Sequence, residues 1–180
     1  MRPSRSAEEW ADDEFADPAV AEMYRAAYAA AMADDIGAAR PLLEAAAAAG
    51  SPRAAYALAT WYVEGETYGQ IDVPRARMLL EQAAAFDIPE ANWDIAIIED
   101  HGKDGPPNAQ AAFDQYLRCA LRGDVNAIAE VWRRFAEGDG IAASRRLADL
   151  FADRAEELGW KEFDDDDAEP DAESGPAVVS

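Results

Sequence analysis

The chain has 180 residues, a single cysteine (Cys119) and a formal net charge of −21. One cysteine excludes an internal disulfide and a cysteine metal cluster, and so large an excess of carboxylates repels phosphate backbones, which disfavours nucleic-acid binding and favours a basic partner. The first residues lack the long apolar segment of a signal peptide, and no run reaches about 18 apolar residues. We therefore expect a cytoplasmic protein without a membrane span, and an export signal outside this sequence stays open as an alternative.

The N-terminal segment, residues 1–16, precedes the first strong helix signal. Ser6 and Glu9 have the spacing of a capping box, which is compatible with a short helix over residues 7–15. Asp17 then offers an N-cap and Pro18 suits the first helical position, so we predict a helix over residues 18–34.

Small residues then recur every 36 or 37 positions, beginning with an alanine set: Ala39, Ala76, Ala112 and Ala148. Each alanine is followed seven positions later by a small residue: Ala46, Ala83, Cys119 and Ala155. Each is preceded four positions earlier by a residue that can cap a helix N-terminus: Asp35, Asp72, Asn108 and Ser144. Eleven positions after each alanine stand Gly50, Asp87, Gly123 and Gly159. Glycine there is typical of a helix C-terminus, so every unit contains a helix of roughly four turns.

A second helix precedes this one in each unit. It has a small residue at one position and a branched apolar residue four positions later: Ala54 and Leu58, Ala91 and Ile95, Ala127 and Val131. This spacing marks a helical face, and Gly65, Gly102 and Gly138 end these helices. No segment alternates with period two. We therefore predict an all-α, right-handed αα-solenoid of about four helix pairs over residues 17–160, with a degenerate N-terminal repeat.

The last residues, 161–180, carry one lysine and eight acidic residues together with proline, glycine and serine. Such a composition buries too little apolar surface to order itself, so we predict a disordered acidic tail.

The repeat pattern resembles that of the Sel1-like repeat family, a branch of the tetratricopeptide-like helical repeats, over about residues 35–159. The second unit supplies most of the usual signature: Ala54, Leu58, Ala59, Tyr62, Gly65, Asp72, Ala76, Leu79, Leu80, Ala83 and Ala84. The last unit supplies Gly138, Gly140 and Ile141 of the turn, followed by Ser144, Ala148, Phe151, Ala155 and Gly159. Two departures stand out: Trp132 fills a position that is small in Ala59 and Ala96, and Glu99 replaces an aromatic residue.

The resemblance implies a scaffold for protein interactions, and its motif residues imply no catalytic role. It also implies that the first helix of each pair lines a concave face. By repeat position this face contains Glu90, Asn126, Ala129 and Ala136 together with nine candidate partner-binding residues: Arg53, Tyr56, Thr60, Val63, Trp93, Ile97, Asp100, His101 and Arg133. Trp93 and Tyr56 occupy equivalent positions, so we expect them side by side.

Neither His101, the only histidine, nor Cys119 has the companions that a metal or catalytic site needs. We therefore expect no cofactor, no metal and no enzyme activity. The favoured function is an adaptor that binds a peptide or helix of another protein, with a basic partner favoured by charge. Two alternatives stay open: an immunity or antitoxin-type inhibitor that occludes a basic toxin, and a hydrolase on a helical-repeat scaffold, for which no nucleophile and base are visible.

Overall fold

The computed structural model describes residues 13, 16–65, 71–86 and 88–159. Every element in this part of the chain is a helix. The helices are α2 (Pro18–Met32), α3 (Ile36–Ala48), α4 (Pro52–Glu64), α5 (Val73–Ala84), α6 (Pro89–His101), α7 (Ala109–Leu121), α8 (Val125–Glu137) and α9 (Arg145–Glu157). The expected short helix over 7–15, the acidic tail and Asp87 lie outside the described residues, apart from Asp13.

The predicted helix starts are confirmed by side-chain caps on backbone amides. The Oδ1 atoms of Asp35, Asp72 and Asn108 accept hydrogen bonds from the amide three residues later, at 3.0, 3.1 and 3.1 Å. Ser144 Oγ accepts the equivalent bond at 3.4 Å, and Asp17 caps α2 ahead of Pro18. Because each cap satisfies one of the orphan amides of a first turn, these residues fix where the helices begin.

The predicted ends of the first helices are confirmed as well. Gly65, Gly102 and Gly138 are C-caps in the left-handed conformation. At Gly102, with φ of 60°, an added Cβ would lie 2.6 Å from the carbonyl oxygen of Gly105. Only glycine fits this turn, which brings the chain from α6 back into α7.

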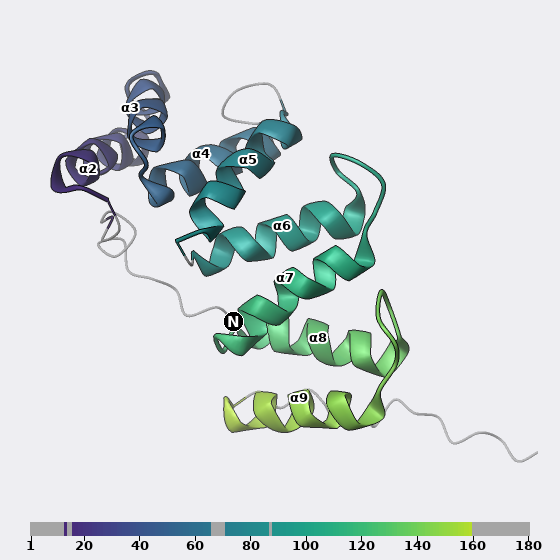
Figure 1. Ribbon diagram of the computed structural model, residues 1–180. Coiled ribbons are helices and arrows are strands. Elements are labelled where there is room, and N and C mark those ends of the chain that lie inside the picture. Colours follow the sequence, from purple (N-terminus) through teal and green to yellow (C-terminus); the bar gives the residue numbers. More distant parts are fainter. Residues whose placement is uncertain (1–12, 14–15, 66–70, 87, 160–180) are drawn as a thin grey trace, which may run out of the picture.

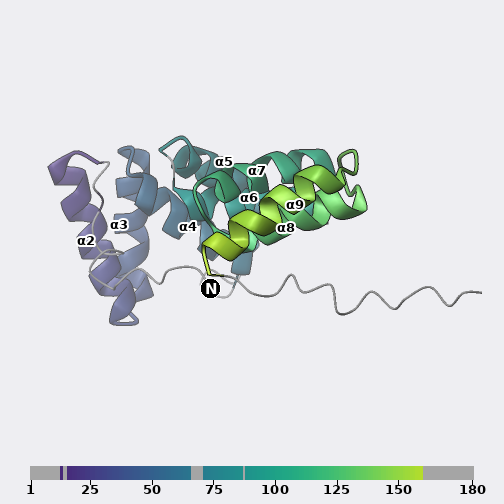
Figure 2. The ribbon, with the colours of Figure 1, turned by 90° about the horizontal axis from the view of Figure 1, so that it is seen from below.

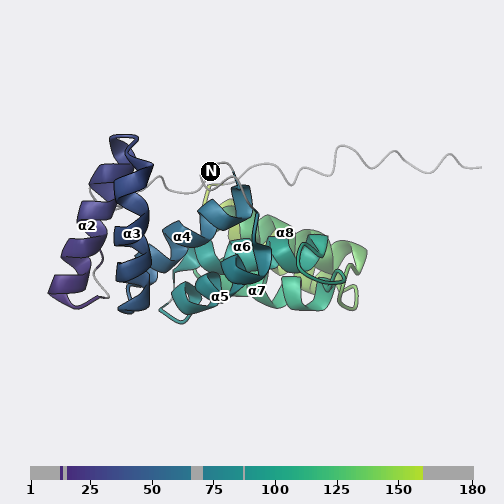
Figure 3. The ribbon, with the colours of Figure 1, turned by 90° about the horizontal axis from the view of Figure 1, so that it is seen from above.

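The helices pair in sequence order, and the pairs stack side by side (Figure 1). Seen from below, α2 and α3 lie at one end of the molecule and α8 and α9 at the other (Figure 2), and the view from above likewise shows α2 and α3 at the end opposite α8 (Figure 3). The repeated small residues are buried where paired helices meet, including Ala39, Ala76, Ala112 and Ala148. This arrangement is an αα-solenoid of four helix pairs, as the repeat predicts.

Two apolar clusters form the core. The first runs from α2 to α6 and the second from α6 to α9. In the second, Phe113 meets Phe135 edge to face at 5.3 Å, and Phe135 stacks on Phe151 at 5.8 Å between ring centroids. These rings hold α7, α8 and α9 together although Trp132 takes a position that is alanine in the two preceding units.

The replacement of an aromatic repeat residue by Glu99 has an electrostatic explanation. Glu99 lies on α6, and its carboxylate accepts a hydrogen bond of 2.7 Å from Arg77 on α5. Arg77 also binds Asp104 in the turn after α6. The acidic residue that replaces the aromatic ring therefore joins two consecutive pairs through a shared guanidinium.

Candidate binding groove

The first helices of the pairs border two adjoining cavities. The larger has a volume of about 370 Å³ and lies between α2 and α4. It is lined by Tyr24, Ala27, Tyr28, Ala31, Leu43, Tyr56, Ala57, Thr60 and Trp61. No charged side chain of the described residues lines it, so its walls offer apolar and aromatic surface with a few hydroxyl groups.

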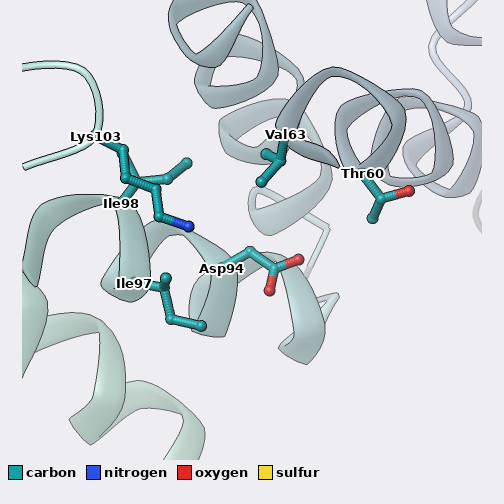
Figure 4. Close-up of a pocket in the computed structure, with 6 residues that line it drawn as sticks. All are labelled: Thr60, Val63, Asp94, Ile97, Ile98 and Lys103. Carbon is teal, nitrogen blue, oxygen red and sulfur yellow. The ribbon is translucent and has the colours of Figure 1, made fainter. Parts of the chain in front are cut away.

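The smaller cavity has a volume of about 120 Å³ and lies between α4 and α6. It is lined by Thr60, Val63, Asp94, Ile97, Ile98 and Lys103 (Figure 4). Figure 4 shows Thr60 and Val63 on one side, and Asp94, Ile97 and Lys103 on the other. Since Thr60 lines both cavities, the two lie next to each other along three first helices, and we call them together the first-helix groove.

A cluster of charged residues occupies the same repeat positions one unit further along. Adding 36 to Asp94, Ile97, Ile98 and Lys103 gives Glu130, Arg133, Arg134 and Asp139. These four residues are joined by hydrogen bonds and ion pairs, and Asp100 and Glu137 complete the group, which we call the acidic cluster.

Arg134 lies at the buried centre of the acidic cluster, with a side chain that is 0% exposed. Its Nη2 donates to Asp100 at 2.6 Å, its Nε to Glu130 at 2.9 Å, and its Nη1 to the carbonyl oxygen of Ala109 at 3.1 Å. The guanidinium carbon also lies 5.2 Å from the ring centroid of Tyr116. Because these partners come from α6, α7 and α8, this one side chain ties three helices together.

Protonation in the acidic cluster follows from these contacts. Burial raises the pKa of Tyr116, and the charges of Asp100 and Glu130 raise it further. Burial acts to raise the pKa of Glu130, but hydrogen bonds from Arg133 and Arg134 outweigh it and lower the pKa. Both arginines and Glu130 therefore stay charged at neutral pH.

Arg133 lies closer to the surface of the same cluster. It donates to Glu130, Glu137 and Asp139 at 2.7, 2.5 and 3.0 Å. Four carboxylates face two guanidiniums in the acidic cluster, which leaves two excess negative charges, and the side chains of Glu137 and Asp139 are 59% and 43% exposed. The cluster therefore presents negative charge to solvent.

The structure divides the nine candidate binding residues into three sets. Tyr56, Thr60, Val63 and Ile97 line the first-helix groove. Arg133 and Asp100 lie in the acidic cluster, Arg133 at the repeat position of Thr60 and Ile97. The other residues have contacts of a different kind: Arg53, Trp93 and His101.

Arg53 is only 3% exposed, and Asp100 binds the buried Arg134. The Trp93 ring packs edge to face against Tyr116 of α7, with centroids 5.0 Å apart. Trp93 is not among the residues that line the larger cavity with Tyr56. Asp100 and Trp93 therefore support the packing of α6 on its neighbours, a role that their repeat positions did not indicate.

Several groove residues were not identified from the sequence. Tyr24 and Tyr28 come from α2, where the repeat phase is mostly lost, so no equivalent position pointed to them. Asp94 and Lys103 could have been found from the sequence. Asp94 lies one helical turn before Ile97, and Lys103 follows His101 directly after the C-cap Gly102. In the acidic cluster, Arg134 was missed as well. The sequence indicates its burial only weakly, through its place three residues after Val131 on the buried face of α8.

His101 and Cys119, the two residues considered for metal binding or catalysis, both contact backbone carbonyl oxygens. His101 is exposed, with Nδ1 3.0 Å from the carbonyl oxygen of Ile97, and Cys119 is buried with its sulfur 3.5 Å from the carbonyl oxygen of Pro89. Within the described ranges, no three His, Cys, Asp or Glu residues are grouped so that they could hold a metal. No described helix is both long enough and apolar enough to cross a bilayer.

Comparison with solved structures identifies the fold. The chain is similar to a Sel1 repeat protein from Oxalobacter formigenes, with 25% identity and a TM-score of 0.57 over 66% of this chain and 89% of the other. It is also similar to a protective antigen of uropathogenic Escherichia coli strains that displays an SLR fold, with 20% identity and a TM-score of 0.70 over 87% of this chain.

The chain spans about a third of the antigen, 34% of its length. No protein-family model and no curated protein matches the sequence. The stacked helix pairs, the spacing of 36 or 37 residues and these two solved structures together show that the chain has the Sel1-like repeat fold.

Proposed function

We propose that the protein is an interaction scaffold that holds a segment of a partner protein in the first-helix groove. The observation that carries this proposal is the adjacency of the two cavities: Thr60 lines both the cavity of about 370 Å³ and that of about 120 Å³. A depression that crosses three helices suits an extended chain or a helix better than a compact small molecule.

The chemistry of the walls supports the same function. Tyr28, Tyr56 and Trp61 are half-buried, so their rings are partly accessible from the larger cavity. Aromatic residues of this kind dominate protein-binding energetics because they bury a large area at little cost in side-chain entropy. Tyr56, Thr60, Val63 and Ile97 are thus the contact residues of the proposal, and the overall charge of −21 favours a basic partner in the cytoplasm.

Site-specific photo-cross-linking tests the proposal. A benzoylphenylalanine placed at Thr60 samples the groove, and one placed at Met78 samples the second-helix side, where that side chain is 71% exposed on α5. In cells that produce the protein, we expect the Thr60 probe to capture a discrete partner and the Met78 probe to leave it uncaptured. Equal capture by both probes, or none by the Thr60 probe, would refute groove binding.

A further inference from the structure

The first-helix groove changes in chemical character along its length. At the α2–α4 end its lining is aromatic and aliphatic, with the Tyr24 and Tyr28 rings 6.4 Å apart and tilted. Between α4 and α6 the lining is mixed, with Ile97 and Val63 beside Asp94 and Lys103. The repeat positions that line this second cavity on α6 are occupied on α8 by residues of the acidic cluster.

By the repeat register, the acidic cluster occupies the positions that follow those of the smaller cavity. In a solenoid, equivalent residues of successive units lie in rows along the stack. Asp94 and Glu130 share one row, Ile97 and Arg133 a second, and Lys103 and Asp139 a third. The third row changes sign from a lysine to an aspartate, so the groove passes from a nearly neutral region into one with excess negative charge.

We infer that the groove selects a partner segment with a large apolar side chain at one end and basic side chains at the other. The apolar side chain fills the cavity between α2 and α4, and the basic side chains meet Glu137 and Asp139. This inference rests on the proposed function and specifies the chemistry of its ligand.

The distance fits a short segment. Each of α4, α6 and α8 packs on the second helices of its own and the preceding pair, and helices packed in this way lie about 10 Å apart. With successive first helices at least about 10 Å apart, the span from the aromatic cavity to the acidic cluster is about 25 Å or more, which an extended chain of about eight to ten residues covers. The two excess carboxylates match two lysine or arginine side chains at the far end of such a segment.

Synthetic ten-residue peptides test this inference on the full-length protein by fluorescence anisotropy. One pair carries phenylalanine at one end and three lysines at the other, in both chain directions. A second pair has glutamates in place of the lysines, and a third has alanine in place of phenylalanine. We expect one lysine–phenylalanine peptide to bind at least about tenfold more tightly than its glutamate and alanine counterparts, with an affinity that falls as salt rises.

Paired charge variants locate the effect. Glu137→Gln with Asp139→Asn should weaken the lysine peptide about tenfold and remove most of its preference over the glutamate peptide. Asp149→Asn with Asp153→Asn removes the same charge from exposed positions of α9, and should leave binding unchanged. The inference is overturned if no peptide binds, if the glutamate peptide binds as tightly, or if both double variants weaken binding equally.

The cross-linking experiment separates this inference from the proposed function. A partner captured at Thr60 through a segment without basic residues would leave the groove as the binding site and overturn the charge selection. Capture failure at Thr60 would overturn both.

Discussion

Replacing Arg134 by methionine should destabilise the protein more than any surface ion-pair change. The substitution keeps an unbranched side chain but removes two charge-assisted hydrogen bonds, at 2.6 Å to Asp100 and 2.9 Å to Glu130. It also leaves the carbonyl oxygen of Ala109 without its bond from Nη1. Removing one partner of a buried ion pair costs about 3–5 kcal/mol, because the remaining charge loses its compensation.

The lower end of that range applies here. The carboxylates of Asp100 and Glu130 are each 23% exposed, so water can partly solvate them, and Glu130 keeps its bond to Arg133. We therefore expect the free energy of unfolding to fall by about 3 kcal/mol. For a chain of this size, that lowers the melting temperature by about 6–12 °C.

Urea unfolding followed by circular dichroism measures the effect at neutral pH. The matched control is Arg154→Met, since Arg154 is 53% exposed and pairs with Glu157 on the same helix. That change should cost less than about 1 kcal/mol. Combining Arg134→Met with Asp100→Asn should cost at least about 1 kcal/mol less than the sum of the single changes. A loss below about 1 kcal/mol for Arg134→Met would contradict the view that this side chain ties three helices together.

Three further predictions concern stability. Ala96→Leu should lower the free energy of unfolding by about 1–3 kcal/mol through overpacking, because Ala96 is fully buried. Ala111→Leu, at a half-buried site, should lower it less. Equal losses of stability in thermal melts would show that the repeat register is wrong. Trp93→Ala should cost about 2 kcal/mol, since it removes a half-buried ring that packs on Tyr116, and unchanged melting would refute this packing role. The pKa of Glu130 is lower in the folded than in the unfolded protein, so its stabilisation is complete above about pH 5 and is lost as pH falls through the folded value. Unfolding titrations of the protein and Glu130→Gln should therefore converge as the pH falls below the folded-state pKa of Glu130, and a gap that stays constant from neutral to strongly acidic pH would contradict this charge state.

The solenoid could be predicted from the sequence because its determinants are local and repeated. A capping residue such as Asp72 acts on amides within three positions, and a stop residue such as Gly138 acts on the turn that follows it. Buried alanines at a constant spacing then specify how the pairs stack, because only small side chains allow close approach of two helices.

The candidate site was only partly predictable because its members meet through long-range contacts. Thr60 and Ile97, which repeat position assigned to the concave face, line the smaller cavity, yet repeat position could not show that Asp100 binds an arginine 34 residues away. Tyr24 and Tyr28 lie in a helix whose sequence has diverged from the repeat, and only packing brings them opposite Tyr56. Periodicity therefore identified the face but not which side chains line its cavities.

The affinity of two arginine variants for the partner segment captured at Thr60 tests the central claim most directly. Thr60→Arg fills the point where the two cavities join, and Met78→Arg adds the same charge at an exposed position of α5. With both variants shown to be folded by circular dichroism, we predict that Thr60→Arg binds at least about tenfold more weakly and that Met78→Arg binds like the unmodified protein. Equal affinities for the two variants would contradict the assignment of the first-helix groove as the binding site.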